Sequence, residues 1–110
     1  MDIFAEIKQI LIAILNLEDE AVTPESYLLR ELGAESVDLL ELAAALQVRF
    51  KIEVDEALLF LPGVWGGEPP RGTIPHLTDE RLGEIAADPS GGPVLKVKDL
   101  VSYVQWKLKQ

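Results

Sequence analysis

The sequence contains no cysteine and only one histidine, His76, among its 110 residues. Without cysteine the chain can form neither a disulfide framework nor a thiolate metal site. A structural zinc site also needs several imidazole or thiolate ligands, and the acidic stretch NLEDEAV (16–22) lacks the ligand spacing of a calcium loop. We therefore expect no bound metal, and a chain suited to a reducing compartment such as the cytoplasm.

Basic residues are also scarce. Ten Lys and Arg stand against nineteen Asp and Glu, so the formal net charge is −9. A chain of this charge repels phosphate backbones and anionic lipid surfaces. The acids are concentrated in residues 1–57, which hold 13 acidic and 4 basic residues. We expect no nucleic-acid partner, and protein partners with basic docking surfaces.

Aromatic residues make up 6% of the chain, although 48% of it is hydrophobic. The interior must therefore be filled mainly by Leu, Ile, Val and Ala, which favours a small helical core, and the length suits one compact domain over 1–110. The stretch MDIFAEIKQILIAIL (1–15) lacks a basic signal region, and Glu6, Lys8 and Gln9 interrupt its apolar residues. We interpret it as a helix of the fold and expect no membrane span.

Apolar residues recur at helical spacing in three segments, 3–15, 36–50 and 97–108. Asp2 is the predicted N-cap of the first helix. The apolar residues scattered through 16–35 predict an ordered loop that packs on the core. Residues 55–93 hold six of the seven prolines, with short helices predicted near 56–61 and 78–87, the second capped by Thr78. The predicted fold class is all-α.

The 36–50 segment carries two separate apolar stripes when its residues are placed at helical spacing. One is wide enough to be the core face and consists of Leu39, Leu42, Ala43, Leu46 and Phe50. The second consists of Val37, Leu40, Ala44 and Val48, with Asp38 and Glu41 beside it. Two interpretations of this second stripe stay open: burial under the chain beyond residue 56, or an exposed surface that docks a partner.

Ser36 stands at the predicted start of that helix. As a hydrolytic nucleophile it would need His76 as a base, but its neighbours lack the glycines of a nucleophile elbow. As an ordinary helix-start serine it would satisfy free backbone amides. The glycine-rich WGGEPPRG (65–72) lacks the strand and lysine of a nucleotide-binding loop. Spacing alone favours the structural interpretation of Ser36.

The stretch LLRELGAESVDLLELAAALQVRFKIEV (28–54) resembles acyl carrier proteins, whose second helix opens on a DLGxDSLDxVEL signature. Here the matching letters are ELGAESVDLLEL (31–42), with Glu35 for the usual aspartate and Val37 for the usual leucine. The resemblance covers residues 1–56 and resumes at LKVKDLVSYV (95–104). It implies an acyl-carrier-like bundle of three long helices, with short helices in an insertion at about 57–93.

The resemblance further implies that Ser36 carries a covalent 4′-phosphopantetheine arm, transferred from coenzyme A by a phosphopantetheinyl transferase. The arm would hold an acyl intermediate as a thioester. Acyl-loading and acyl-transfer or condensing enzymes of fatty-acid, polyketide or related lipid biosynthesis would supply the catalysis, and the chain would be a monomeric cytoplasmic carrier and phosphoprotein with no catalytic residues of its own. The residues expected to dock these partners are Glu35, Val37, Asp38, Leu40, Glu41 and Ala44.

Two alternatives remain within the same fold. An aminoacyl or peptidyl carrier commonly has a GGxS context before the serine, and Ala34-Glu35 argues against that branch. A carrier-like protein-interaction domain that is never modified would use the acidic helix only for binding, and the Glu35 departure keeps that interpretation open.

Overall fold

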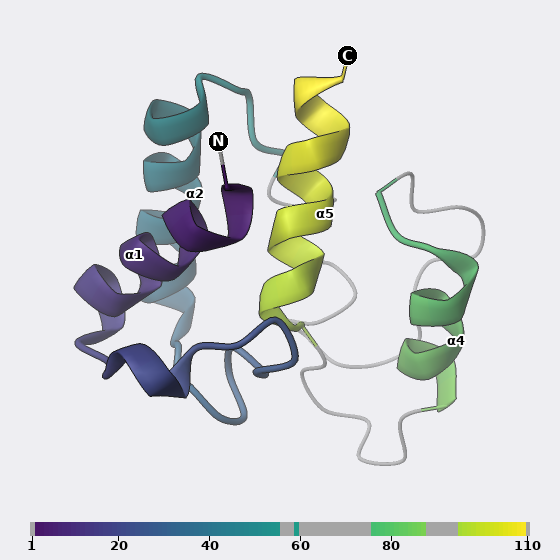
Figure 1. Cartoon of the computed structure of the whole chain (residues 1–110), viewed down its shortest axis with the longest axis horizontal. Coiled ribbons are helices and arrows are strands. Elements are labelled where there is room, and N and C mark those ends of the chain that lie inside the picture. The colour runs from purple at the N-terminus through teal and green to yellow at the C-terminus, as the bar shows by residue number, and fades with distance from the viewer. Residues whose placement is uncertain (1, 56–58, 60–75, 88–94, 110) are drawn as a thin grey trace.

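The computed structural model describes residues 2–55, 59, 76–87 and 95–109, which form α-helices and loop segments (Figure 1). The helices are α1 (Ile3–Leu15), the 3₁₀ turn η1 (Asp19–Ala21), α2 (Ser36–Phe50), α4 (Asp79–Ala87) and α5 (Val97–Leu108). Within these ranges the only β-type pairing is an isolated antiparallel bridge between Tyr27 and Lys96. The all-α prediction and its three long helices are confirmed. The helix predicted near 56–61 lies outside the described residues, apart from buried Leu59.

The three long helices each contact the other two and enclose one aliphatic core (Figure 1). The predicted core stripe of α2 is buried, and Leu46 is fully inaccessible. Ile7 and Leu11 of α1 and Leu100 of α5 pack in the same cluster. Burial of these side chains is the main force that holds the helices together.

Local signals in the sequence set the helix ends. Asp2 accepts a hydrogen bond from the Ala5 amide at 3.1 Å, which confirms the predicted N-cap of α1. This helix ends where Asn16 adopts a left-handed conformation, and α2 ends in the same way at Lys51. Thr78 Oγ1 accepts from the Arg81 amide at 3.1 Å, as predicted for the start of α4.

The loop between α1 and α2 is ordered and packed, as the sequence indicated. Val22, Leu28 and Leu32 are buried within it. Its backbone pairs with the start of α5, since the Leu28 amide donates to the Leu95 carbonyl at 2.9 Å. The loop therefore fixes the chain that leads into α2 against α5.

α4 lies beside α5, on the side away from α1 and α2 (Figure 1). A buried ion pair joins Arg81 of α4 to Asp99 of α5. Leu77, Leu82 and Ile85 form a small apolar cluster of their own. The described part of the 57–93 segment thus packs on α5. In the described part of the chain, no helix is long and apolar enough to cross a membrane.

Candidate functional site

The chain enters α2 through a tight turn held from inside the protein. Gly33 has φ of +75°, a left-handed conformation that suits glycine. Leu32 and Ala34 on either side of it are buried. The Ala34 amide donates to the Leu28 carbonyl at 3.0 Å. These contacts fix the backbone two residues before Ser36, the first residue of α2.

The first turn of α2 has the electrostatic character of a helix N-terminus, where the helix dipole gives a partial positive charge. Asp38 closes the turn, because its Oδ2 accepts a hydrogen bond from the Glu35 amide at 2.9 Å. The neighbours of Ser36 are open to solvent: Glu35 is exposed and Val37 is 60% exposed. A large molecule can therefore approach this turn from outside.

The second apolar stripe of α2 faces solvent. Leu40 is 58% and Val48 79% exposed, and Ala44 is exposed between them. Glu41 is exposed and Asp38 half-buried beside this stripe. The exposure of these side chains favours the second of the two interpretations that the sequence left open, and the described segment 76–87 of the later chain packs on α5. We call the stripe and its acids (Glu35, Val37, Asp38, Leu40, Glu41, Ala44 and Val48) the α2 face.

His76 lies against α5, away from the start of α2. Its ring packs edge-on against Tyr103 at 5.1 Å between centroids and lies 6.2 Å from the ring of Trp106, both in the later half of α5. The Tyr103 hydroxyl accepts from the amide of Asp55, beyond the C-terminal end of α2. Because α2 has 15 residues and each adds about 1.5 Å, its two ends are about 20 Å apart. The structure does not bring His76 to the start of α2, which removes the basis for a Ser36–His76 hydrolase.

The environment of His76 makes it a poor base in any case. The residue is 7% exposed, and neither ring nitrogen has a hydrogen-bond partner among the described residues. Burial lowers its pKa from 6.5 to about 4, and the negative charge of Asp99 offsets only part of that effect. Within the described ranges, no group of three or more His, Cys, Asp or Glu side chains could hold a metal ion.

Sequence reasoning missed the most deeply buried ion pair of the described residues, that of Arg81 and Asp99. The two residues stand 18 positions apart in the chain. No local pattern marks such a pair, because it forms only when α4 packs on α5. The burial of His76 depends on the same packing.

Comparison with known proteins shows the family of this chain. The family model described as "Phosphopantetheine attachment site" matches residues 5–62, a range that covers most of α1 and the whole of the ordered loop and α2. The chain belongs to the acyl carrier protein family. The match ends before α4 and α5, so the buried pair lies in the part of the chain that the family model does not cover.

Curated relatives of this chain are named acyl carrier proteins. The acyl carrier protein of Wolinella succinogenes is 41% identical over 56 residues, which are 51% of this chain and 74% of that protein. The acyl carrier protein of Helicobacter pylori is 38% identical over 56 residues, covering 51% of this chain and 72% of that protein. The protein from Campylobacter fetus is 35% identical over 57 residues, covering 52% and 74%.

The cofactor that this family membership brings is 4′-phosphopantetheine. The start of α2 fits such a group. A helix N-terminus favours a phosphate, and the exposed neighbours Glu35 and Val37 leave room for an attached arm. The group supplies a thiol for thioester formation, which a chain without cysteine cannot supply itself.

Proposed function

We propose that Ser36 is the attachment residue and that the protein carries an acyl intermediate between enzymes of fatty-acid, polyketide or related lipid biosynthesis. The observation that supports this most directly is the position of Ser36. It is the first residue of α2, follows an anchored turn and has solvent-exposed neighbours. An attached arm at this place can reach the active sites of other proteins, while the chain itself supplies no catalytic group.

The α2 face is proposed to dock the transferase and the acyl-handling enzymes. Val37, Leu40 and Ala44 offer an apolar centre, and Glu35, Asp38 and Glu41 surround it with negative charge. Partners with a basic rim around an apolar patch are complementary to it. Exposed charges of this kind mainly set the association rate and the choice of partner, and each is worth little affinity by itself.

Intact mass after incubation with coenzyme A and a promiscuous phosphopantetheinyl transferase tests the attachment. We expect one phosphopantetheine on the parent chain and none on Ser36→Ala. The variant of a neighbouring hydroxyl, Ser26→Ala, is a poor control because the Ser26 hydroxyl donates to the Ala21 carbonyl. Ser102→Ala, at a half-buried position of α5, is the better control, and it should be modified like the parent. No gain on the parent with several transferases would favour the interaction domain that is never modified.

The docking role has its own test. Glu41→Lys should slow association with the transferase, and the loss should shrink as salt is added, because screening weakens the attraction. Glu20→Lys, an equal charge change on the exposed turn η1, serves as the matched control. Equal slowing by both variants would show that only net charge matters, and the α2 face would lose its proposed role.

Loading assays on the modified protein distinguish the cargo classes. We expect acyl groups from acyl-loading enzymes and not aminoacyl groups from adenylating enzymes. We also propose a monomeric, cytoplasmic carrier, and its mass by light scattering in solution tests the first of these statements.

A further inference from the structure

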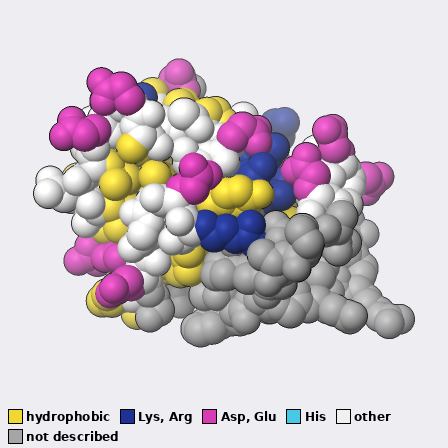
Figure 2. All heavy atoms as spheres, turned by 90° about the horizontal axis from the view of Figure 1, so that it is seen from below, with side chains coloured by type: hydrophobic (Ala, Val, Ile, Leu, Met, Phe, Trp, Pro, Cys, Tyr) yellow, Lys and Arg dark blue, Asp and Glu magenta, His cyan; other side chains and the backbone are white. Residues whose placement is uncertain are grey.

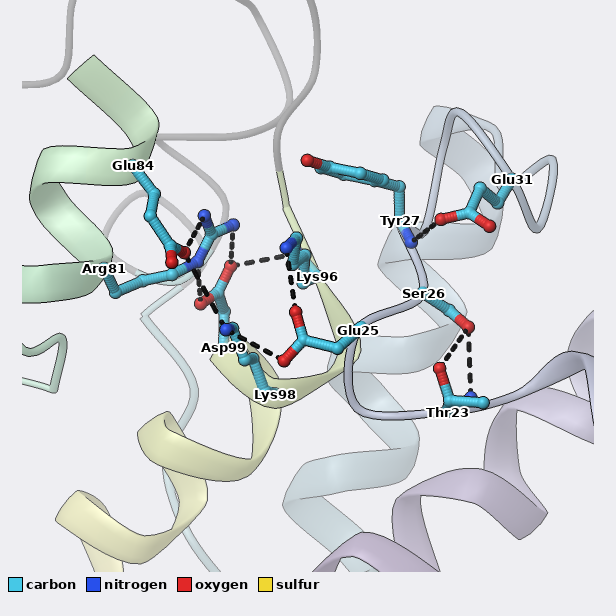
Figure 3. Close-up of polar contacts among 10 residues, drawn as sticks. All are labelled: Thr23, Glu25, Ser26, Tyr27, Glu31, Arg81, Glu84, Lys96, Lys98 and Asp99. Atoms are coloured by element: carbon cyan, nitrogen blue, oxygen red, sulfur yellow. Dashed lines mark hydrogen bonds and ion pairs between the residues drawn. The ribbon is translucent and has the colours of Figure 1, made fainter. Parts of the chain in front are cut away.

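Asp99 in the first turn of α5 joins three parts of the molecule (Figure 3). Its two carboxylate oxygens accept from Arg81 Nε at 2.8 Å and Arg81 Nη2 at 2.9 Å. Oδ2 also accepts from the backbone amide of Lys96, the residue before α5, at 2.9 Å. Asp99 is 2% exposed and the Arg81 side chain 7% exposed. A buried carboxylate of this kind is stable only with such partners.

The start of α5 is in turn bound to the loop after α1. The amides of Val97 and Lys98 donate to the carbonyls of Ser26 and Pro24, each at 3.0 Å. The side chains reinforce this pairing, because the amino groups of Lys96 and Lys98 both reach the Glu25 carboxylate, at 2.9 and 3.0 Å. Figure 3 shows the side-chain contacts running from Arg81 of α4, through Asp99, Lys96 and Lys98 at the start of α5, to Glu25 of the loop.

The same loop leads directly to Ser36. The Leu28 amide donates to the Leu95 carbonyl, and the Leu28 carbonyl accepts from the Ala34 amide. Leu28 is fully buried, so its backbone is also held by packing. Two hydrogen bonds therefore connect residue 95, next to the Asp99 cap, with the residue two before Ser36.

Resting on the proposed attachment at Ser36, we propose that Arg81 is a positioning residue for this site. Its planar guanidinium holds both oxygens of Asp99, which fixes the start of α5, the loop 24–34 and hence the turn that presents Ser36 to the transferase. The segment between α2 and α5 then has a function: it supplies the cation that completes this connection. Lysine cannot replace Arg81 fully, because an ammonium group lacks the two-pronged geometry that matches a carboxylate.

Amide hydrogen exchange on the full chain tests the connection without any enzyme. In Arg81→Met we expect exchange at the Leu28, Ala34 and Val97 amides to become about tenfold faster, since local opening costs less free energy. Arg81→Lys should give a smaller increase. The control is Val104→Ala, a fully buried site on α5 without a polar contact to the loop, compared with Arg81→Met at urea concentrations where both have equal global stability.

The second readout is the rate at which the transferase modifies Ser36. For Arg81→Met we expect kcat/KM to fall about three- to tenfold, with partial recovery in Arg81→Lys and little change in Val104→Ala. Unchanged exchange at Leu28 and Ala34 in Arg81→Met would refute the connection. An equal rate loss in Val104→Ala would show a merely global effect and would also overturn it. A parent chain that is not modified at all would instead refute the attachment at Ser36, and the exchange data would still decide whether Arg81 holds the loop.

Discussion

The buried imidazole of His76 makes folding stability depend on pH in a way that can be measured. The ring is 7% exposed, lies against Tyr103 and Trp106, and has a pKa lowered to about 4 by burial. In the unfolded chain the same ring takes up a proton near its ordinary pKa of 6.5. Between these two pH values the unfolded state binds more protons than the folded state, so stability falls as the pH falls.

The size of the effect follows from the two pKa values. The interval from 6.5 to about 4, at about 1.4 kcal/mol for each pH unit, corresponds to about 3 kcal/mol. This stability is fully present above pH 6.5 and is lost as the pH falls to about 4. For a single domain of ordinary stability, about 5–15 kcal/mol in total, that is a large fraction.

Urea unfolding of the parent chain and of His76→Phe at a series of pH values isolates this contribution. Phenylalanine keeps an aromatic ring against Tyr103 and Trp106 and cannot be protonated. The carboxylates titrate in both proteins, so their effect cancels in the difference between the two unfolding free energies. We expect the parent to lose stability relative to the variant by up to about 3 kcal/mol between pH 6.5 and 4. Two curves that fall in parallel would refute the buried, neutral state of His76.

Three further predictions concern the core, the turn and the loop. Leu46→Ala should lower the free energy of unfolding by about 2–5 kcal/mol, because Leu46 is fully buried in α2; urea unfolding checks it, and a smaller loss would contradict close packing there. Gly33→Ala should cost about 1 kcal/mol from backbone strain alone, since a Cβ at this φ of +75° meets nothing within 4 Å; an unchanged midpoint would argue against the left-handed turn. The hydrogen bonds from Lys96 and Lys98 hold the pKa of Glu25 below 4.5, so the stabilising effect of its charge is present above that pH and lost as the pH falls below it. In an NMR titration, Lys96→Met should raise this pKa more than Lys98→Met. The reverse order would contradict Lys96 as the main cause of the lowered pKa.

The main helices were predictable because the information that specifies them is local. Apolar spacing gave the extents of α1, α2 and α5, and the short polar residues Asp2 and Thr78 gave two starts that the hydrogen bonds confirm. The exposure of Val48 was not predictable, because it depends on which face the later chain covers.

The candidate site was also predictable only in part. The letters around Ser36 indicated the family, and the family model confirms that resemblance. Arg81, Asp99 and the burial of His76 escaped sequence reasoning, because each depends on the packing of α4 on α5. An isolated arginine in an acidic helix is typical of a solvated surface, and only the tertiary structure shows that this one is buried.

α4 lies beside α5, on the side away from α1 and α2 (Figure 1), and this position suits it for a reporter group. Figure 2 shows acidic side chains scattered over the face that is seen from below. Gly83 of α4 is exposed, and a side chain added there would meet open space. Since the chain has no cysteine, Gly83→Cys would provide a single thiol for a fluorescent dye before the arm is attached. The dye would stand on α4, apart from α2, so that binding of partner proteins at the proposed docking surface of α2 could be followed in real time.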